Sequence, residues 1–289
     1  MANTKRKTTA TTTDEAKMNA PDPKKLDECL FFKRLGFELS DEQKIFRDAI
    51  YSPDIDIVFV NAPAGSGKNV VAISTSCLMV ECGLYDEIIY CFSLNNGFQN
   101  TVGLLPGTIE DKEASFYEPC MQALITCGYQ PQKVIRELNP EGEKNGSAFI
   151  SCRSHTFMRG INISERTILI IDEAANFYLD ELKKVLTRVK DGTKVIVIGH
   201  SGQNDIVAHP EYSGFESYIE HFRGKPRVAI CELTHNFRGW VSRWADELDT
   251  DEMRLRARRK KRKQEKEERE REIFLDSLEE SENDEEDID

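Results

Sequence analysis

Residues 62–70 form a glycine-rich segment between an apolar run (residues 57–60) and a largely apolar stretch of helical character from Asn69 to Cys82. Small residues let successive backbone N–H groups turn toward an anion, and the N-terminus of a following helix adds partial positive charge. Lys68 can reach the β- and γ-phosphates of a nucleotide as a point charge. An ordinary glycine-rich turn is the alternative. The residues predicted to surround a nucleotide are Ala62, Pro63, Ala64, Gly65, Ser66, Gly67, Lys68, Asn69 and Val70.

The last position of this segment departs from the usual phosphate-loop pattern, which begins with Gly or Ala and ends in Ser or Thr. Ala62 fits the first position, but Asn69 stands where a hydroxyl is usual. That hydroxyl normally helps to hold a magnesium ion, and a carboxamide oxygen is a weaker and longer substitute. We therefore expect the backbone amides and Lys68 to bind a nucleotide, with Asn69 as a candidate Mg²⁺ ligand and turnover reduced.

A second candidate site is the apolar run 167–171, which ends in the two carboxylates Asp172 and Glu173. At the tip of a strand, Asp172 is placed to hold a magnesium ion through water, and Glu173 to polarise an attacking water. The alternative is an acidic helix start, where carboxylates interact favourably with the helix dipole. The position of the pair, about a hundred residues after a phosphate loop, favours the catalytic interpretation.

Two glutamines are further candidates. Gln203 follows the apolar run 195–198 and could sense the γ-phosphate, although a polar turn is the alternative. Gln43 lies ahead of the first apolar run, and its amide offers one donor and one acceptor, which matches the edge of adenine. Equally, Ser40 and Gln43 could form a capping box at the start of a helix.

Three arginines, Arg159, Arg188 and Arg238, could stabilise the charge of a phosphoryl-transfer transition state. Solvation at the surface is the alternative for each of them. The five histidines have no spacing typical of a zinc site.

Composition bounds the class of protein. The chain has 289 residues, 39% apolar and 31% charged, with a net charge of −12. This excludes a fully disordered chain and a protein that is basic all over. No run approaches the ~18 continuous apolar residues that a membrane span needs, and the first 25 residues lack an apolar signal core. The eight cysteines show no C-x-x-C pair, which predicts reduced core thiols of a cytoplasmic protein.

The pattern along the chain predicts three parts. Residues 1–26 are rich in threonine, and we expect a flexible tail. Residues 27–250 alternate apolar, β-branched runs with helical stretches, which predicts an α/β domain with a mostly parallel sheet and helices on both faces. Residues 251–289 are densely charged, and we expect a solvated helix followed by a disordered acidic end. The predicted strands are residues 57–60, 88–91, 168–171, 195–198 and 228–230.

Several motifs in this order resemble the PhoH family, single-domain P-loop ATPases related to the first motor domain of superfamily 1 helicases. The resemblance covers about residues 38–245. Besides the glycine-rich segment, it includes L-G-F-L-P-G, M-R-G, D-E-A-Q-N, L-T-R and G-D-x-x-Q-x-D elements. In this chain they correspond to residues 102–107, 158–160, 172–176, 186–188 and 199–205. Ala175 and His200 depart from the family pattern, as does Asn69.

The resemblance implies a RecA-like P-loop core that binds ATP with Mg²⁺ and hydrolyses it. It also implies a cytoplasmic location (the host cytoplasm for a phage-encoded copy) and a link to phosphate starvation. A single motor domain has no second lobe to supply an arginine finger. We therefore expect Arg188 or Arg238 to come from a neighbouring subunit in a ring or dimer.

Two other functions remain open. Three changed positions near the γ-phosphate, Asn69, Ala175 and His200, favour a nucleotide-gated binding module with slow or no hydrolysis. The family kinship and the basic run 254–263 favour an ATPase that remodels single-stranded RNA, with the basic run contacting phosphates. A solvated charged helix is the alternative for that run.

Overall fold

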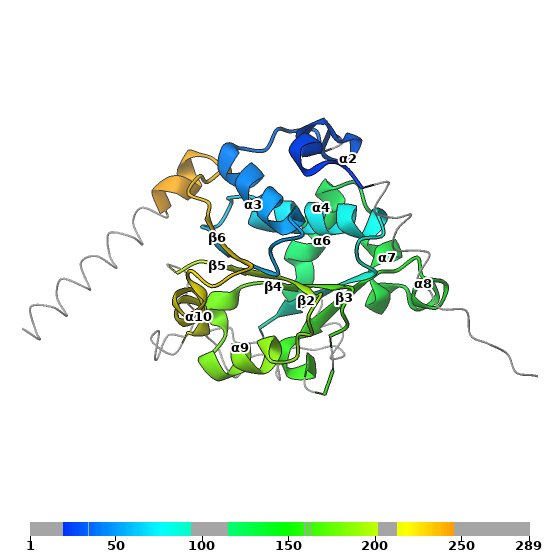
Figure 1. The fold of residues 1–289 in the computed structure, drawn as a ribbon. Helices are drawn as coiled ribbons and strands as arrows, with labels where there is room; N and C mark the ends of the chain where they lie inside the picture. Colours follow the sequence, from blue (N-terminus) through cyan, green and yellow to red (C-terminus); the bar gives the residue numbers. More distant parts are fainter. Residues whose placement is uncertain are drawn as a thin grey trace, which may run out of the picture. The chain divides into compact units, whose positions relative to one another are not determined.

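A computed structural model of the chain describes residues 20–33, 35–93, 115–158, 160–161, 163–201 and 213–245. At its centre lies a six-stranded sheet in the order β3-β2-β4-β5-β1-β6 (Figure 1). Every neighbouring pair of strands is parallel. This confirms the predicted α/β class with a parallel sheet. The strands are β1 Ile57–Asn61, β2 Glu87–Phe92, β3 Ile150–Ser154, β4 Thr167–Ile171, β5 Lys194–Gly199 and β6 Val228–Glu232.

Five of these strands were predicted from their apolar runs, and β3 was missed. Its sequence, Ile-Ser-Cys-Arg-Ser, contains one strongly apolar residue, although four of its five residues are buried. Small polar side chains fill these buried positions, as Ser151 and Ser154 do. A search for continuous apolar runs therefore passes over it.

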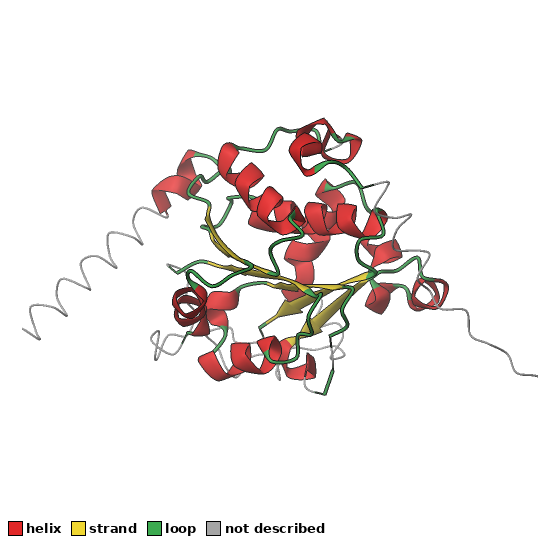
Figure 2. Ribbon diagram, in the orientation of Figure 1, coloured by secondary structure: helices red, strands yellow, loops and turns green. Residues whose placement is uncertain are grey.

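Helices cover both faces of the sheet, as Figures 1 and 2 show. Along β1, Val58 and Val60 belong to one buried cluster, whereas Ile57 and Phe59 belong to the other. This alternation follows from the two-residue period of a strand, and it explains why the run is apolar throughout. The larger helices are α3 Asp41–Tyr51, α4 Lys68–Glu81 and α6 Glu118–Thr126 on the first face, and α9 Leu179–Leu186 and α10 Gly214–Phe222 on the second.

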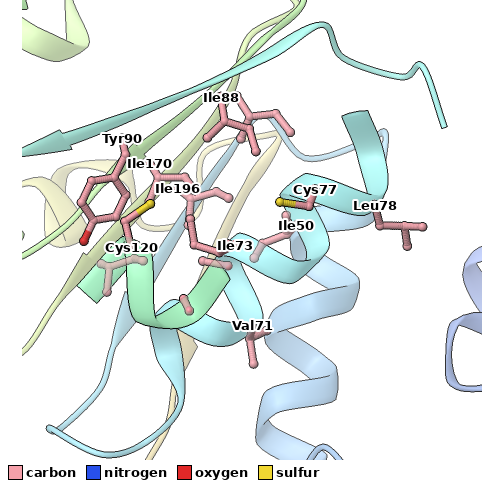
Figure 3. Close-up of a cluster of buried hydrophobic side chains, with 14 of the residues drawn as sticks. Ile50, Val71, Ile73, Cys77, Leu78, Ile88, Tyr90, Cys120, Ile170 and Ile196 are labelled. Atoms are coloured by element: carbon pink, nitrogen blue, oxygen red, sulfur yellow. The ribbon is translucent and has the colours of Figure 1, made fainter. Parts of the chain in front are cut away.

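The first cluster lies between the sheet and helices α3, α4 and α6. Figure 3 shows part of it, with Ile73 and Cys77 of α4 packed toward Ile170 and Ile196 of the sheet. All eight cysteines are free. Burial raises the pKa of Cys231 to about 11 and that of Cys127 to about 12, so these thiols stay protonated at neutral pH.

The folded region begins earlier than the predicted boundary at residue 26. A short 3₁₀ helix, η1 Pro23–Glu28, buries Leu26 in the first cluster. Buried Arg47 of α3 holds this segment through an ion pair with Asp27 at 2.5 Å. The contacts are long-range, so local composition gave no sign of them. Other short elements are α2 Leu30–Lys33, η3 Ser115–Tyr117, α7 Pro131–Val134, η4 Arg136–Leu138, α8 Pro140–Asn145, η5 His155–Met158 and η6 Ala174–Asn176.

The chain divides into two compact units, residues 1–237 and residues 238–289. In the second unit the structure describes residues 238–245, where Trp240 and Trp244 meet edge to face at 5.7 Å between ring centroids. Among the described residues, no helix combines the length and apolarity that crossing a bilayer requires. The sequence-based boundary at residue 250 and the expected tail character of residues 1–19 and 251–289 lie outside the described ranges and stay predictions.

The order of the strands decides which strands helix α4 crosses. Strands β1 and β2 are joined through α4, but β5 and β4 lie between them in the sheet. Helix α4 therefore crosses the face of β5 and β4, from the carboxyl edge where β1 ends toward the amino end of β2. As a result, the first turn of α4 comes close to the residues that follow β4.

Candidate functional site

The glycine-rich segment links the carboxyl end of β1 to the first turn of α4. Gly65 and Gly67 have φ values of 77° and 78°, in the left-handed region that favours glycine. A Cβ on Gly67 would lie 2.6 Å from Gln43 Nε2, so the neighbour also demands glycine here. Among the described residues, no side chain caps the N-terminus of α4. Its first N–H groups are thus available to an anion.

Lys68 begins α4, and its side chain is buried against the loop. Its ammonium donates to the carbonyl oxygen of Ala62 at 3.4 Å, the far limit of a hydrogen bond. A phosphate oxygen would be a shorter and stronger partner for a buried ammonium. This geometry suits the phosphate-binding role predicted for Lys68.

Gln43 ties helix α3 to the loop. Its Nε2 donates to the carbonyl oxygen of Ser66 at 2.8 Å, and its Oε1 accepts from the N–H of Ser40 at 3.0 Å. The Ser40 hydroxyl oxygen accepts from the N–H of Gln43, which completes the capping box. The structural alternative for Gln43 is therefore confirmed. Its predicted contact with adenine stays a prediction. Both the nitrogen and the oxygen of this amide already form hydrogen bonds within the protein.

The segment after β6 also contacts the loop, which the sequence did not reveal. The N–H of Phe237 donates to the carbonyl oxygen of Gly65 at 2.9 Å, and the Phe237 ring is 52% exposed. The Glu42 carboxylate accepts from the N–H and hydroxyl of Thr234 at 2.8 and 2.6 Å. The hydroxyl contact lowers the pKa of Glu42. Glu42 and Thr234 are 192 positions apart, so no local pattern could signal this contact.

The predicted metal residues Asn69 and Asp172 meet. Asn69 Nδ2 donates to Asp172 Oδ2 at 2.8 Å, and the hydroxyl of Tyr90 donates to the same oxygen. Burial raises the pKa of Tyr90 well above its ordinary value, so this hydroxyl keeps its proton and acts as the donor. The N–H of Glu173 donates to the other carboxylate oxygen, Oδ1, at 2.9 Å. Tyr90 also belongs to this site, and it was not predicted from the sequence. Nothing distinguishes it there from the other residues of an apolar strand.

Glu173 has an unusual backbone. Its φ of 51° and ψ of 42° place a non-glycine residue in the left-handed region, which costs about 1 kcal/mol or more. Such strain persists where surrounding contacts over-determine it, and it is frequent at functional sites. The conformation turns the chain at Glu173, directly after Asp172.

The oxygen atoms present here fit a magnesium ion. Asn69 Oδ1 is buried and has no hydrogen-bond partner among the described residues, and the same holds for Ser66 Oγ in the loop. Mg²⁺ prefers carboxylate, amide and water oxygens and is usually bound by one or two side chains together with substrate phosphates. An unsatisfied oxygen on Asn69 next to the Asp172 carboxylate matches that requirement.

The residues after β5 are held by β1. Asn61 Oδ1 accepts from the N–H of Ser201 at 3.0 Å and lies 3.4 Å from His200 Nδ1. His200 therefore stands at the carboxyl edge of the sheet beside the end of β1. Gln203, the predicted γ-phosphate sensor, lies outside the described residues, as do Arg159 and residues 102–107.

Of the two candidate arginine fingers, Arg188 can be placed relative to the loop. Helix α9 begins beyond the carboxyl end of β4 and runs back, and Val189 forms an isolated parallel bridge with Ile163, ahead of the first residue of β4. Arg188 thus lies near the amino ends of the strands, at the opposite edge from the glycine-rich loop. Its Nε is buried without a partner among the described residues. Arg238 belongs to the second unit.

A family model described as "PhoH-like protein" matches residues 38–240, well over half of the chain. The chain belongs to the PhoH family. The matched part of this PhoH chain includes the glycine-rich loop, the Asn69–Asp172 contact, the Glu173 turn and the segment that binds Gly65. The resemblance inferred from the motifs is confirmed.

Curated PhoH proteins share this region. "Protein PhoH2" of Bacillus subtilis is 27% identical over 216 residues, which is 72% of this chain and 46% of that protein. A "PhoH-like protein" of Synechocystis is 30% identical over 197 residues, covering 66% of this chain and 56% of that protein. This PhoH chain therefore spans about half the length of the curated relatives that it matches.

Among solved structures, the PhoH chain is similar to two bacteriophage large terminases. The large terminase of a thermophilic bacteriophage, solved in complex with ADP, gives a TM-score of 0.42 at 12% identity, with 68% of this chain and 46% of that chain covered. The large terminase of bacteriophage HK97 gives a TM-score of 0.40 at 11% identity, with 71% and 41% covered.

Proposed function

We propose that this PhoH chain binds ATP with Mg²⁺ at the loop between β1 and α4 and hydrolyses it slowly. The observation that carries the proposal is the hydrogen bond from Asn69 to Asp172, because it joins the helix of the phosphate loop to the acid that follows β4. Phosphate-binding and metal-binding groups are thereby held next to each other. That combination is what phosphoryl transfer with a metal requires.

Each residue has a distinct part in this proposal. The backbone N–H groups of residues 65–69 and the ammonium of Lys68 bind the phosphates. Asn69 Oδ1 and Asp172 hold Mg²⁺, which when bound neutralises charge that develops on the phosphate oxygens. Glu173 orients a water and accepts its proton, while Gln203 senses the γ-phosphate. Gln43 supports the loop, and the exposed ring of Phe237 offers a surface beside it.

The first test is magnesium-dependent ATP turnover of the purified chain, with and without single-stranded RNA. Lys68→Ala should abolish turnover, because it removes the ammonium that binds the phosphates. Lys184→Ala is the matched control, since Lys184 is an exposed residue of α9 paired with Asp180. Turnover that persists in Lys68→Ala would contradict the proposed site.

A nucleotide-gated binding module is the second candidate, and the carboxamide at Asn69 is the observation that favours it. Asn69→Thr separates the two candidates by supplying the usual hydroxyl. A large gain in turnover would indicate a catalytic site weakened by Asn69. Unchanged turnover would argue that Asn69 is not what limits hydrolysis.

Binding of single-stranded RNA is a third candidate. Trp240, Val241 and Trp244 are 64%, 62% and 67% exposed within one helical stretch that also contains Arg243. Nucleic-acid bases stack on exposed aromatic rings, and arginines bind the phosphates. The basic run 254–263 would add sequence-independent contacts.

The RNA proposal is tested by titrating a single-stranded RNA against salt. We expect Trp240→Ala with Trp244→Ala to weaken binding at all salt concentrations, and deletion of residues 251–289 to lower the salt dependence. Unchanged affinity and slope in both variants would exclude this surface. A link to phosphate starvation is a proposal that rests on the family alone. A cytoplasmic location rests on the family and on the cysteine pattern, and a ring or dimer is proposed because an arginine would have to come from another subunit.

A further inference from the structure

We propose that Tyr90 is a positioning residue for the metal end of the nucleotide site, acting through Asp172. The inference rests on the proposed Mg-ATP site and names a residue that fixes the orientation of the Asp172 carboxylate in it. Tyr90 lies on β2, away from the glycine-rich loop, and it touches the site through the Asp172 carboxylate alone among the contacts described here.

Strand β2 fixes Asp172 at two points. The N–H of Asp172 donates to the carbonyl oxygen of Cys91 at 2.9 Å, which continues the parallel ladder between β2 and β4. One residue earlier, the Tyr90 hydroxyl reaches the side chain of the same aspartate. Backbone and side chain of Asp172 are thus both set by β2, and the carboxylate cannot rotate without losing a hydrogen bond.

The two oxygens of the Asp172 carboxylate accept different numbers of hydrogen bonds. Oδ2 accepts from both Tyr90 and Asn69, whereas Oδ1 accepts from the N–H of Glu173. A carboxylate has about four acceptor positions, so the remaining one is on Oδ1. Tyr90 and Asn69 together therefore determine which oxygen of Asp172 is available to a metal ion or to a water bound to it.

A hydroxyl can donate and accept hydrogen bonds through one oxygen. The amide of Asn69 has a separate donor, Nδ2, and a separate acceptor, Oδ1. Its Nδ2 donates to Asp172, and its Oδ1 is left buried without a partner among the described residues. Because a buried acceptor without a partner is costly, this oxygen indicates a ligand position. The hydrogen bond from Nδ2 fixes the orientation of this amide, and with it the position of Oδ1, only while Asp172 stays where Tyr90 holds it.

Burial makes the Tyr90 contact strong and specific. Tyr90 and Asp172 are 0% and 1% exposed, so no water competes for the hydrogen bond. In Figure 3 the Tyr90 ring packs with the buried cluster, with its hydroxyl oxygen at the edge of the side chains drawn. Tyr90→Phe therefore removes the hydrogen bond and leaves the packed ring in place.

The test measures metal binding without turnover. The affinity of the ADP complex for Mn²⁺, followed by electron paramagnetic resonance, should fall about tenfold in Tyr90→Phe, the effect of losing one hydrogen bond to a charged group. The affinity for ADP in EDTA should stay within about twofold of wild type, since the phosphate loop is untouched. Tyr51→Phe is the matched control, because it removes another buried tyrosine hydroxyl, one bonded to the carbonyl oxygen of Pro21 at 2.9 Å.

The outcomes separate the inference from the function on which it rests. Wild-type Mn²⁺ affinity in Tyr90→Phe, or an equal loss of ADP affinity in EDTA, would overturn the positioning role. Wild-type protein that binds neither ADP nor Mn²⁺ with ADP would overturn the proposed function itself. Tyr90→Met, which also lacks the hydroxyl but has a flexible side chain, gives the same measurement if the phenylalanine variant does not fold.

Discussion

Asn69 Nδ2 lies 2.8 Å from Asp172 Oδ2, although 103 positions separate the two residues in the sequence. The contact exists because α4 begins at the carboxyl edge of the sheet and crosses the face of β5 and β4 on its way from β1 to β2. It links the first turn of the loop helix to the acid after β4. An asparagine that departs from the usual pattern therefore still joins the two halves of the site.

Asn69→Leu removes both functions of this side chain at nearly constant volume. We expect the affinity for ATP in Mg²⁺ to fall at least tenfold, because the carbonyl oxygen toward the metal is lost. We also expect the free energy of unfolding to fall by about 1–3 kcal/mol, because Asp172 loses a donor in a buried place. Fluorescent-nucleotide binding with and without EDTA, together with urea denaturation, measures both. An unchanged metal dependence would remove Asn69 from the site.

Glu173→Gln is expected to lower turnover at least 100-fold with little change in ATP affinity, since an amide cannot accept a proton from water. Single-turnover hydrolysis and nucleotide binding measure the two effects separately. A parallel loss of affinity would mean that Glu173 holds the nucleotide rather than the water.

The left-handed backbone at Glu173 makes a second prediction for the same position. Glu173→Gly should be more stable than Glu173→Ala by about 1 kcal/mol, because glycine adopts a φ of 51° without strain. Both variants lack the carboxylate, so the comparison isolates the backbone. Equal unfolding free energies would show that the turn relaxes in the variants.

Arg188 can act on a nucleotide only from another subunit, since it lies at the opposite edge of the sheet from its own loop. We expect Arg188→Ala and Lys68→Ala each to lack turnover, and a mixture of the two to regain part of it, because a mixed interface pairs an intact loop with an intact arginine. Turnover of the mixture against each variant alone, with mass measured by light scattering, checks this. Full activity in a monomer would exclude the arrangement.

Lys194 provides a pH-dependent test of the fold. Burial lowers its pKa from 10.5 to about 8, and its ammonium donates to the carbonyl oxygens of Ser52 and Ile55. Above pH 10.5 the lysine is neutral in both states. As the pH falls toward 8 the unfolded chain binds the proton first, so stability decreases through that window and is level below it.

Lys194→Met isolates this effect from the other groups that titrate at high pH. Between pH 8 and 10.5, wild type should gain about 3 kcal/mol of unfolding free energy relative to the variant. Urea denaturation of both proteins at several pH values gives the difference. A constant difference across the window would mean that Lys194 has an ordinary pKa in the folded chain.

The sequence by itself determined the local parts of this protein. Apolar, β-branched runs identified five strands, because strands covered on both faces need no polar alternation. Glycines at 65 and 67, followed by Lys68 and a helix, identified the loop, because its backbone conformation and its charge are local properties. Asp172 and Glu173 were found because they end a buried strand.

Only the tertiary structure decided how these parts meet. Strand order is set by crossovers and not by any local pattern, and it alone brings Asn69 and Tyr90 to Asp172 and moves Arg188 to the far edge. The same holds for the bond from Gln43 to the loop, which a capping pattern could not reveal. Contacts between residues far apart in the sequence depend on how distant segments pack together. Local sequence patterns contain no information about that packing.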